Sequence, residues 1–304
     1  MHKRLRSIAG LLFFILCILL AGCSLTPQNA EERLVFPPDE RIVGITIDDG
    51  WYEDLSVSEI VSAVKKMPVK PTVRIVMSRE MAVEEYVPIF RALHSVAYVM
   101  ATPVDSYEMA SYPDISSYRE RFIQCEEILG EWVDLWEIGN EINGDWLGDE
   151  ASVSEKMFSA FQEIRQRGGR CVLTAYYTKP KMQSIEMEEW LERYVPREMK
   201  EELDYLFVSY YEDDNEGYRP DWQKIFDHLG SEFPHSKLGI GECGFASADV
   251  DKEEKIERIR SYYKMPKYHE NYVGGYFWWY WVQDCLMQED PVLELFCDRE
   301  FLLE

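Results

Sequence analysis

The sequence has few basic residues for its length. Its 304 residues include 32 Lys and Arg against 56 Asp and Glu, which gives a formal net charge of −24 at pH 7. So acidic a surface repels nucleic acid and anionic lipid, because both carry charge of the same sign. The composition therefore excludes nucleic-acid partners and predicts a neutral rather than a polyanionic substrate.

Cysteine and histidine are also scarce, and neither forms a ligand motif. The seven cysteines include no closely spaced pair of the kind found in zinc sites and redox motifs. Five of them follow residue 30, an odd number that leaves at least one thiol free: Cys125, Cys171, Cys243, Cys285 and Cys297. We expect most to be small buried apolar residues, with one disulfide possible, and we expect no metal and no cofactor.

Long apolar runs are absent apart from a short one at the N-terminus. Three basic residues precede apolar residues 8–20, which are too few to span a bilayer comfortably and are typical of a secretory signal. The run ends in LAGC at residues 20–23, which resembles the bacterial lipobox, where the signal is cut before a cysteine that is then lipidated. The alternative is an ordinary signal or anchor helix with a chance cysteine. We expect removal of residues 1–22, membrane attachment through lipid on Cys23, and a domain that works outside the cytoplasm.

Residues 23–40, with Pro27, Pro37 and Pro38, have the composition of a tether between the lipid and a folded domain. Residues 41–304 contain no linker-like break, no repeat and no low-complexity segment. Their length is that of a single eight-fold barrel, about 250 residues. We therefore predict one domain over residues 41–304, working as a monomer.

Short apolar runs alternate with longer amphipathic segments along this domain. The predicted strands are Ile42–Ile47, Thr72–Met77, Ala97–Ala101, Leu135–Gly139, Cys171–Tyr176, Tyr205–Ser209, Lys237–Gly241 and Gly275–Trp279. The predicted helices are Ser56–Lys66, Val83–Leu93, Ser116–Trp132, Val153–Arg167, Glu186–Glu201, Asp221–Phe233, Asp251–Tyr263 and Val292–Phe296. Eight strands alternating with eight helices predict an α/β fold, a closed parallel (β/α)8 barrel (TIM barrel). An open doubly wound sheet is the alternative, but its glycine-rich dinucleotide turn is missing after the first strand.

In such a barrel the carboxyl ends of all strands surround one mouth, where residues distant in sequence meet. The residues at the predicted strand ends are carboxylates, one arginine, amides, hydroxyls and aromatic rings: Asp48, Asp49, Trp51, Arg74, Thr102, Asp105, Asn140, Glu141, Tyr176, Tyr177, Tyr210, Tyr211, Glu242, Trp278, Trp279 and Trp281. Trp146 follows in a Gly-rich loop and is a candidate platform for substrate. Flat rings pack on the C–H faces of sugars while polar groups hold hydroxyls, so the set indicates a carbohydrate substrate.

Two short motifs carry a family resemblance. LWEIGNEINGDWLG at residues 135–148 places Asn140 and Glu141 after the fourth predicted strand, and GIGECGF at residues 239–245 places Glu242 after the seventh. This pattern resembles the large clan of retaining glycoside hydrolases with a (β/α)8 barrel. IGNEINGDW is also locally similar to the acid/base segment of endo-galactanases. The resemblance implies that Glu141 is the acid/base and Glu242 the nucleophile of a β-glycosidase.

The same resemblance implies roles for the residues around the two carboxyl groups. It implies that Asn140 holds the 2-hydroxyl of the sugar, and that Arg74 and Tyr210 form hydrogen bonds with the nucleophile. Trp278 or Trp279 would form the floor of a sugar subsite. Asp48 and Asp49 then bind substrate hydroxyls or cap a loop. Two positions depart from the pattern of the clan, and they leave the sugar specificity open: Ile142, where many relatives carry Pro, and Cys243.

The chemistry of the two carboxyl groups supports this interpretation independently. Retaining hydrolysis needs two of them about 5 to 5.5 Å apart, one protonated to release the leaving oxygen and one ionised to attack the anomeric carbon. Arg74 and the Tyr210 hydroxyl would stabilise the ionised Glu242. Glu141, beside that charge and apolar walls, would keep its proton. Once Glu242 is esterified its charge disappears, and Glu141 can then activate water.

Three other interpretations stay open at this stage. Glu141 could cap the following helix, which explains one glutamate but not Glu242. TIDDG at residues 46–50 resembles the first motif of polysaccharide deacetylases, which also need a histidine pair one helical turn apart for their metal. The histidines of the mature chain are not so spaced: His94, His228, His235 and His269. The chain could also be a non-catalytic carbohydrate-binding lipoprotein, which would bind glycans without releasing reducing sugar.

Overall fold

The computed structural model describes residues 41–247, 249–289 and 291–303. The predicted signal in residues 1–22, the tether and the lipidation of Cys23 lie outside the described residues and stay predictions. A Cys23→Ser variant, which cannot be lipidated, would check them by its recovery in the soluble fraction. Within the described residues, no helix is long and apolar enough to cross a membrane.

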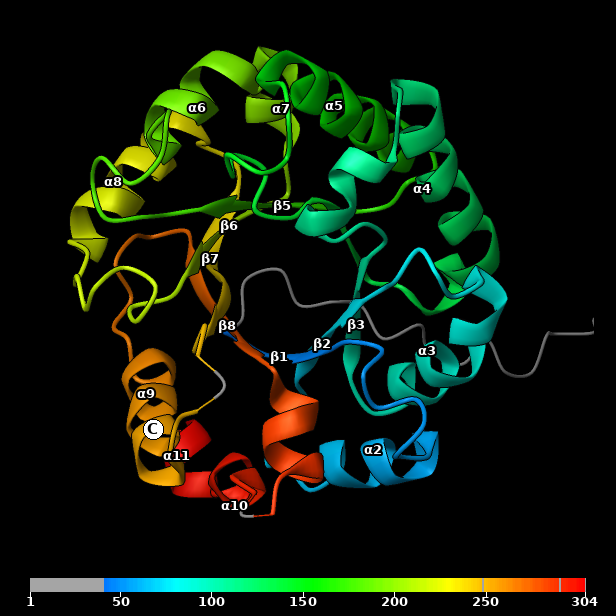
Figure 1. Cartoon of the computed structure of the whole chain (residues 1–304), viewed down its shortest axis with the longest axis vertical. Coiled ribbons are helices and arrows are strands. Elements are labelled where there is room, and N and C mark those ends of the chain that lie inside the picture. The colour runs from blue at the N-terminus through cyan, green and yellow to red at the C-terminus, as the bar shows by residue number, and fades with distance from the viewer. Residues whose placement is uncertain (1–40, 248, 290, 304) are drawn as a thin grey trace, which may run out of the picture. The chain divides into compact units, whose positions relative to one another are not determined.

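Within the described residues, eight parallel strands close into one barrel in chain order, and β8 pairs with β1. The strands are β1 (Ile42–Ile47), β2 (Thr72–Val76), β3 (Tyr98–Thr102), β4 (Leu135–Gly139), β5 (Cys171–Tyr176), β6 (Tyr205–Tyr210), β7 (Lys237–Gly244) and β8 (Tyr272–Trp279). Figure 1 shows the strands at the centre and the helices around them. The predicted (β/α)8 barrel is confirmed, and β1, β4 and β5 have the predicted bounds.

α-Helices cover the outside of the barrel (Figure 1), and shorter helical turns lie in the connections and after the last strand. They are α2 (Val57–Val64), η1 (Val83–Tyr86), α3 (Val87–His94), η2 (Ser106–Ser111), α4 (Ile115–Leu129), η3 (Gly130–Trp132), α5 (Glu150–Gln166), α6 (Met187–Tyr194), α7 (Arg197–Glu202), α8 (Trp222–Glu232), α9 (Lys252–Tyr263), η4 (Gln283–Met287), α10 (Leu293–Cys297) and α11 (Arg299–Leu303). Side chains of the N-cap residues start five of the α-helices by accepting a backbone N–H: Ser56, Asp114, Asp149, Asp221 and Asp251.

Two helices that the sequence predicts as continuous are divided at a proline. The segment around Glu186–Glu201 forms α6 and α7, because Pro196 cannot donate a backbone N–H and holds the residue before it in an extended conformation. The segment Val83–Leu93 forms η1 and then α3, with Pro88 in the first turn of α3, where a missing N–H is tolerated.

The start of β8 was also predicted incorrectly, three residues too late. Gly274 and Gly275 have φ values of +91° and +97°, which other residues rarely adopt. A Cβ on Gly275 would lie 2.2 Å from the carbonyl oxygen of Ile240 on the neighbouring β7. The two strands therefore pack backbone against backbone at this point, where a Gly-Gly pair in the sequence indicates a turn.

The barrel interior carries a layer of polar residues below its mouth. The Arg74 side chain on β2 donates through Nε to Glu137 Oε2 on β4 at 2.8 Å. The hydroxyls of Thr102 on β3 and Thr174 on β5 donate to the same carboxylate. All four residues are buried. The layer thus holds Arg74 in a single orientation, with its Nη1 toward the mouth.

Candidate active site

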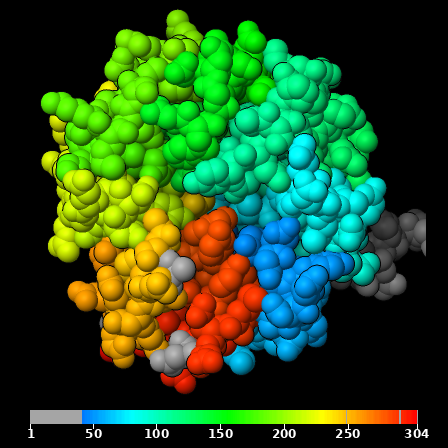
Figure 2. Space-filling view, in the orientation of Figure 1, coloured from blue at the N-terminus to red at the C-terminus, as the bar shows by residue number. Residues whose placement is uncertain are grey.

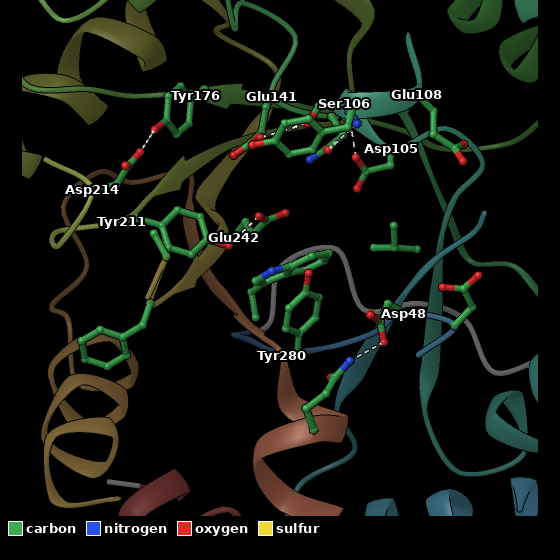
Figure 3. A pocket seen from close by; sticks show the side chains of 18 of the residues that line it. Asp48, Asp105, Ser106, Glu108, Glu141, Tyr176, Tyr211, Asp214, Glu242 and Tyr280 are labelled. Atoms are coloured by element: carbon green, nitrogen blue, oxygen red, sulfur yellow. Dashed lines mark hydrogen bonds between the residues drawn. The ribbon is translucent and has the colours of Figure 1, made fainter. Parts of the chain in front are cut away.

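A cleft of about 780 Å³ opens at the carboxyl ends of the strands. Its walls come from the loops after β1, β2, β3, β4, β5, β6, β7 and β8, so it gathers residues from the whole chain. Figure 2 shows the hollow on this face, between green and teal segments on one side and orange and blue segments on the other. In Figure 3, Glu141 and Ser106 lie on one side of the cleft, Asp48 and Tyr280 lie opposite, and Glu242 lies between.

Glu141 lies at the end of β4 in an uncommon backbone conformation. Its φ is 45°, in the left-handed region that a non-glycine residue seldom adopts and that is concentrated at functional sites. Its carboxyl oxygens accept hydrogen bonds from Ser209 Oγ at 2.7 Å and Ser106 Oγ at 3.1 Å. The helix-cap interpretation is wrong, because α5 begins nine residues later and Asp149 caps it.

Burial and the neighbouring charge of Glu242 raise the pKa of Glu141 to about 8. The two serine hydroxyls only partly oppose this shift. No cation is bonded to this carboxyl group among the described residues. Glu141 therefore holds its proton at neutral pH and can serve as a general acid.

Two asparagines fix the backbone around Glu141. Asn143 accepts the Tyr176 backbone N–H at 2.7 Å and donates to the Tyr176 carbonyl at 2.8 Å, which ties the loop after β4 to the end of β5. Asn140 accepts the Ser106 backbone N–H at 3.0 Å. Its amide nitrogen is buried at the cleft without a hydrogen-bond partner in the described chain. This free donor fits the predicted role of Asn140 in holding a hydroxyl of the substrate.

Glu242 on β7 has the opposite surroundings to Glu141. Arg74 Nη1 donates to its Oε2 at 2.6 Å, and the Tyr211 hydroxyl donates to its Oε1 at 2.6 Å. Burial raises the pKa of Glu242, while the Arg74 charge and the Tyr211 hydrogen bond act to lower it. Both carboxylate oxygens thus have a donor, and the ionised form is the one that these donors stabilise.

The predicted contact between Tyr210 and Glu242 is wrong by one residue. Tyr210 directs its hydroxyl to the Tyr218 carbonyl and packs its ring on Trp222, outside the barrel. Side chains alternate between the two faces of a strand, and Ser209 already points inward to Glu141. Tyr211, two residues after Ser209, therefore faces the mouth, and Tyr210 between them faces out.

The neighbouring tyrosines provide a matched test of this register. Tyr211→Phe removes one hydrogen bond to a charged carboxylate, so we expect kcat to fall roughly 10- to 100-fold. Loss of the donor also raises the pKa of Glu242, so the acidic limb of the kcat/KM profile should move to higher pH. Tyr210→Phe should keep kcat within about twofold. Equal effects of the two substitutions on kcat would contradict the assignment.

Two of the predicted aromatic contacts are also corrected. Trp278 is fully buried and donates its indole N–H to Asp284 at 2.8 Å, so it belongs to the core behind the site. Trp279, the next residue, points the other way and lines the cleft. Trp51 is 6% exposed and packs in the hydrophobic core instead of lining the cleft. Of the predicted platforms, the structure therefore brings Trp279 and Trp146 to the substrate side.

Asp48 and Asp49 line the cleft on the side of β1. Asp48 accepts Gln283 Nε2 at 2.7 Å and the Gly50 backbone N–H at 3.2 Å, which joins the loop after β1 to the segment after β8. Burial raises its pKa. No histidine of the described residues lines the cleft, so these aspartates lack the histidines that the deacetylase interpretation requires.

Several residues of the site were not predicted as site residues. They are Ser106, Tyr107, Glu137, Ser209 and Tyr280. Glu137 could have been found from its spacing, because it lies on the same face of β4 as Glu141. Ser106 and Tyr107 lie in the short helix η2, which leaves no periodic signal in the sequence. The five free cysteines of the described chain, four of them buried, do not line the cleft.

No family model and no curated protein matches the sequence. Solved structures match it at low identity. A glucosidase from Croceicoccus marinus aligns with 79% of this chain at 14% identity and a TM-score of 0.54, and the chain spans 60% of that protein. A broad specificity endoglucanase from an uncultured bacterium aligns with 79% of this chain at 12% identity and a TM-score of 0.54, over 87% of its own length.

A third structure, Gas2p of Saccharomyces cerevisiae in complex with laminaritetraose and laminaripentaose, aligns with 79% of this chain at 14% identity and a TM-score of 0.50. The chain spans 56% of that protein. Identities this low show the fold alone. Fold and site together define a (β/α)8 barrel with two buried carboxyl groups of unlike surroundings at its mouth.

Proposed function

We propose that the chain is a glycosidase that hydrolyses β-glycosidic bonds of a neutral oligo- or polysaccharide with retention of anomeric configuration. One observation carries the proposal. Glu141 and Glu242 are buried at the same mouth, but serine hydroxyls contact the first, and a guanidinium and a phenol contact the second. Such a pair separates a proton donor from an ionised nucleophile, which is what double displacement needs.

In the first step, the Glu242 carboxylate attacks the anomeric carbon, and Glu141 gives its proton to the glycosidic oxygen as that bond breaks. The leaving alcohol departs and a glycosyl ester of Glu242 remains. Arg74 stays bonded to Glu137, so it keeps its place when Glu242 loses its charge. The free amide N–H of Asn140 is available to a sugar hydroxyl throughout this step.

In the second step, Glu141 works as a base. The charge of Glu242 is one cause of the raised pKa of Glu141, and this charge is absent in the ester. The pKa of Glu141 therefore falls, so the ionised carboxylate can take a proton from water as the water oxygen attacks the anomeric carbon. The ester bond breaks, and Glu242 recovers its charge and its two donors.

The named activities of the neighbours are consistent with this proposal. They are a glucosidase, an endoglucanase and a protein crystallised with laminaritetraose and laminaripentaose. The cleft adds aromatic rings and hydrogen-bonding groups in the mixture that neutral sugars need. The identity of the sugar is left to experiment.

The test is hydrolysis of a panel of β-linked aryl glycosides and polysaccharides, followed by proton NMR of the first anomer released. We expect the β-anomer to appear first with at least one substrate. First appearance of the α-anomer would contradict retention. If the protein binds a glycan without releasing reducing sugar, and if Glu242→Ala binds it with the same affinity, the chain is a carbohydrate-binding lipoprotein and not an enzyme.

A further inference from the structure

One aromatic side chain at the cleft is exposed to an unusual degree. Tyr107 on η2 is 79% exposed, more than any other large hydrophobic side chain that the structure describes as exposed. Its ring stacks on Trp146 with a centroid distance of 5.7 Å and an interplanar angle of 20°. Both residues line the cleft. The pair thus presents a flat apolar surface to solvent inside a polar cleft.

The stacked pair is supported from behind. The Trp146 and Tyr176 rings pack at a steep angle with their centroids 5.1 Å apart, and the Tyr176 hydroxyl donates to Asp214 at 2.6 Å. A Cβ on Gly144 would lie 2.6 Å from the Trp146 ring, so only glycine at this position allows the ring its place. The platform is therefore preformed by packing before any ligand arrives.

The pair is also fixed next to the acid/base carboxyl group. Ser106, the residue before Tyr107, donates through its hydroxyl to Glu141 and through its backbone N–H to Asn140. The Tyr107 backbone N–H donates to Asp105 at 2.8 Å. Partial burial and then the charge of Glu141 raise the pKa of Tyr107. Tyr107 is thus an acid-side residue of the cleft.

The position of the ring pair beside Glu141 indicates which part of a substrate it would contact, an inference that rests on the proposed function. A general acid touches the glycosidic oxygen, and the group beyond that oxygen is the one that leaves. The nucleophile lies on the opposite face of the sugar that stays. We propose that the ring pair of Tyr107 and Trp146 binds the sugar on the leaving-group side of the cleaved bond, so that the preferred substrates are β-linked oligo- and polysaccharides.

A direct test compares substrates with and without a leaving sugar. The probes are laminaritetraose and β-1,4-galactotetraose, and β-glucosyl and β-galactosyl fluoride, whose fluoride leaves without a sugar subsite. Loss of one stacking ring costs roughly tenfold in affinity for the bound group. For Tyr107→Ala we expect the ratio of tetrasaccharide to fluoride kcat/KM to fall about tenfold. Tyr107→Phe keeps the ring and should keep the ratio.

Two controls make the outcome interpretable. Tyr52 is 50% exposed and does not line the cleft, so Tyr52→Ala should leave both rates unchanged. Gly144→Ala displaces Trp146 from below and should lower the same ratio as Tyr107→Ala. An unchanged ratio in Tyr107→Ala, with active wild-type protein, overturns the leaving-sugar platform alone. Failure of the wild-type protein to hydrolyse all four probes and every member of the β-glycoside panel instead overturns the proposed function.

Discussion

Glu242→Ala is expected to lower kcat/KM on any hydrolysed β-glycoside by about 10⁴-fold or more, because it removes the atom that forms the covalent bond. Alanine also leaves space below the anomeric carbon. Azide should enter this space and attack a substrate with a good leaving group, such as a dinitrophenyl β-glycoside. The product would be the α-glycosyl azide, since one displacement inverts the configuration. Kinetics with and without azide, and NMR of the product, measure both effects.

A control must show that the Glu242→Ala protein is still folded. Glu242 accepts hydrogen bonds from Arg74 and Tyr211, so its removal leaves buried donors without an acceptor and lowers the stability of the protein. Circular dichroism at the assay temperature separates unfolding from loss of chemistry. Recovery of turnover by azide is itself a sign of an intact site. A folded Glu242→Ala protein with wild-type activity would contradict the assignment of Glu242 as the nucleophile.

The fold could be predicted from the sequence because each strand of a parallel barrel is buried on both faces. β1 and β5 are mostly apolar runs, each with one threonine, and their limits could be identified to the residue. The failures have local causes. Pro196 divides a helical pattern whose amphipathic period continues across it. Gly274 and Gly275 lie inside β8 in a conformation that glycine alone adopts easily. Two adjacent glycines usually indicate a turn, so the sequence placed the start of this strand too late.

The site could be predicted only as far as strand ends allow. Glu141 and Glu242 were found because all carboxyl ends of a barrel meet at one mouth. The choice between Tyr210 and Tyr211 needs the direction of each side chain, and the register of β6 against β7 shifts between Val208 and Ser209. A shift of this kind leaves no sequence signal. The same holds for Trp278 and Trp279, adjacent rings of which one faces the core.

The polar layer below the mouth explains why the two carboxyl groups differ. Arg74 is shared between Glu137 and Glu242, so part of its charge is balanced inside the barrel whatever the state of the reaction. Glu141 has no such partner, and burial dominates its titration. The asymmetry therefore originates in the interior of β2 and β4, one layer below the residues that would touch substrate.

Glu141→Gln is expected to have an effect that depends on the leaving group. Glutamine cannot donate a proton to the glycosidic oxygen, so kcat/KM for β-linked oligosaccharides should fall by about 10²- to 10⁴-fold. A dinitrophenyl β-glycoside needs no proton, so its first step should change far less. With Glu141→Ala, azide should attack the glycosyl-enzyme from the side of the lost carboxylate and give the β-glycosyl azide, opposite in configuration to the product of Glu242→Ala.

The pH dependence gives this assignment a second, independent measurement. The acid must be protonated to work, and burial together with the charge of Glu242 raises the pKa of Glu141 to about 8, so wild-type kcat/KM should fall as pH rises through that value. The alkaline limb should vanish in Glu141→Gln. Because the folded state holds this proton above the pH where the unfolded chain releases it, the free energy of unfolding of the wild type should decrease as pH rises from about 4.5 to about 8. Glu141→Gln should show a smaller decrease, because the contribution of Glu141 is gone. An unchanged alkaline limb would assign the acid to another group.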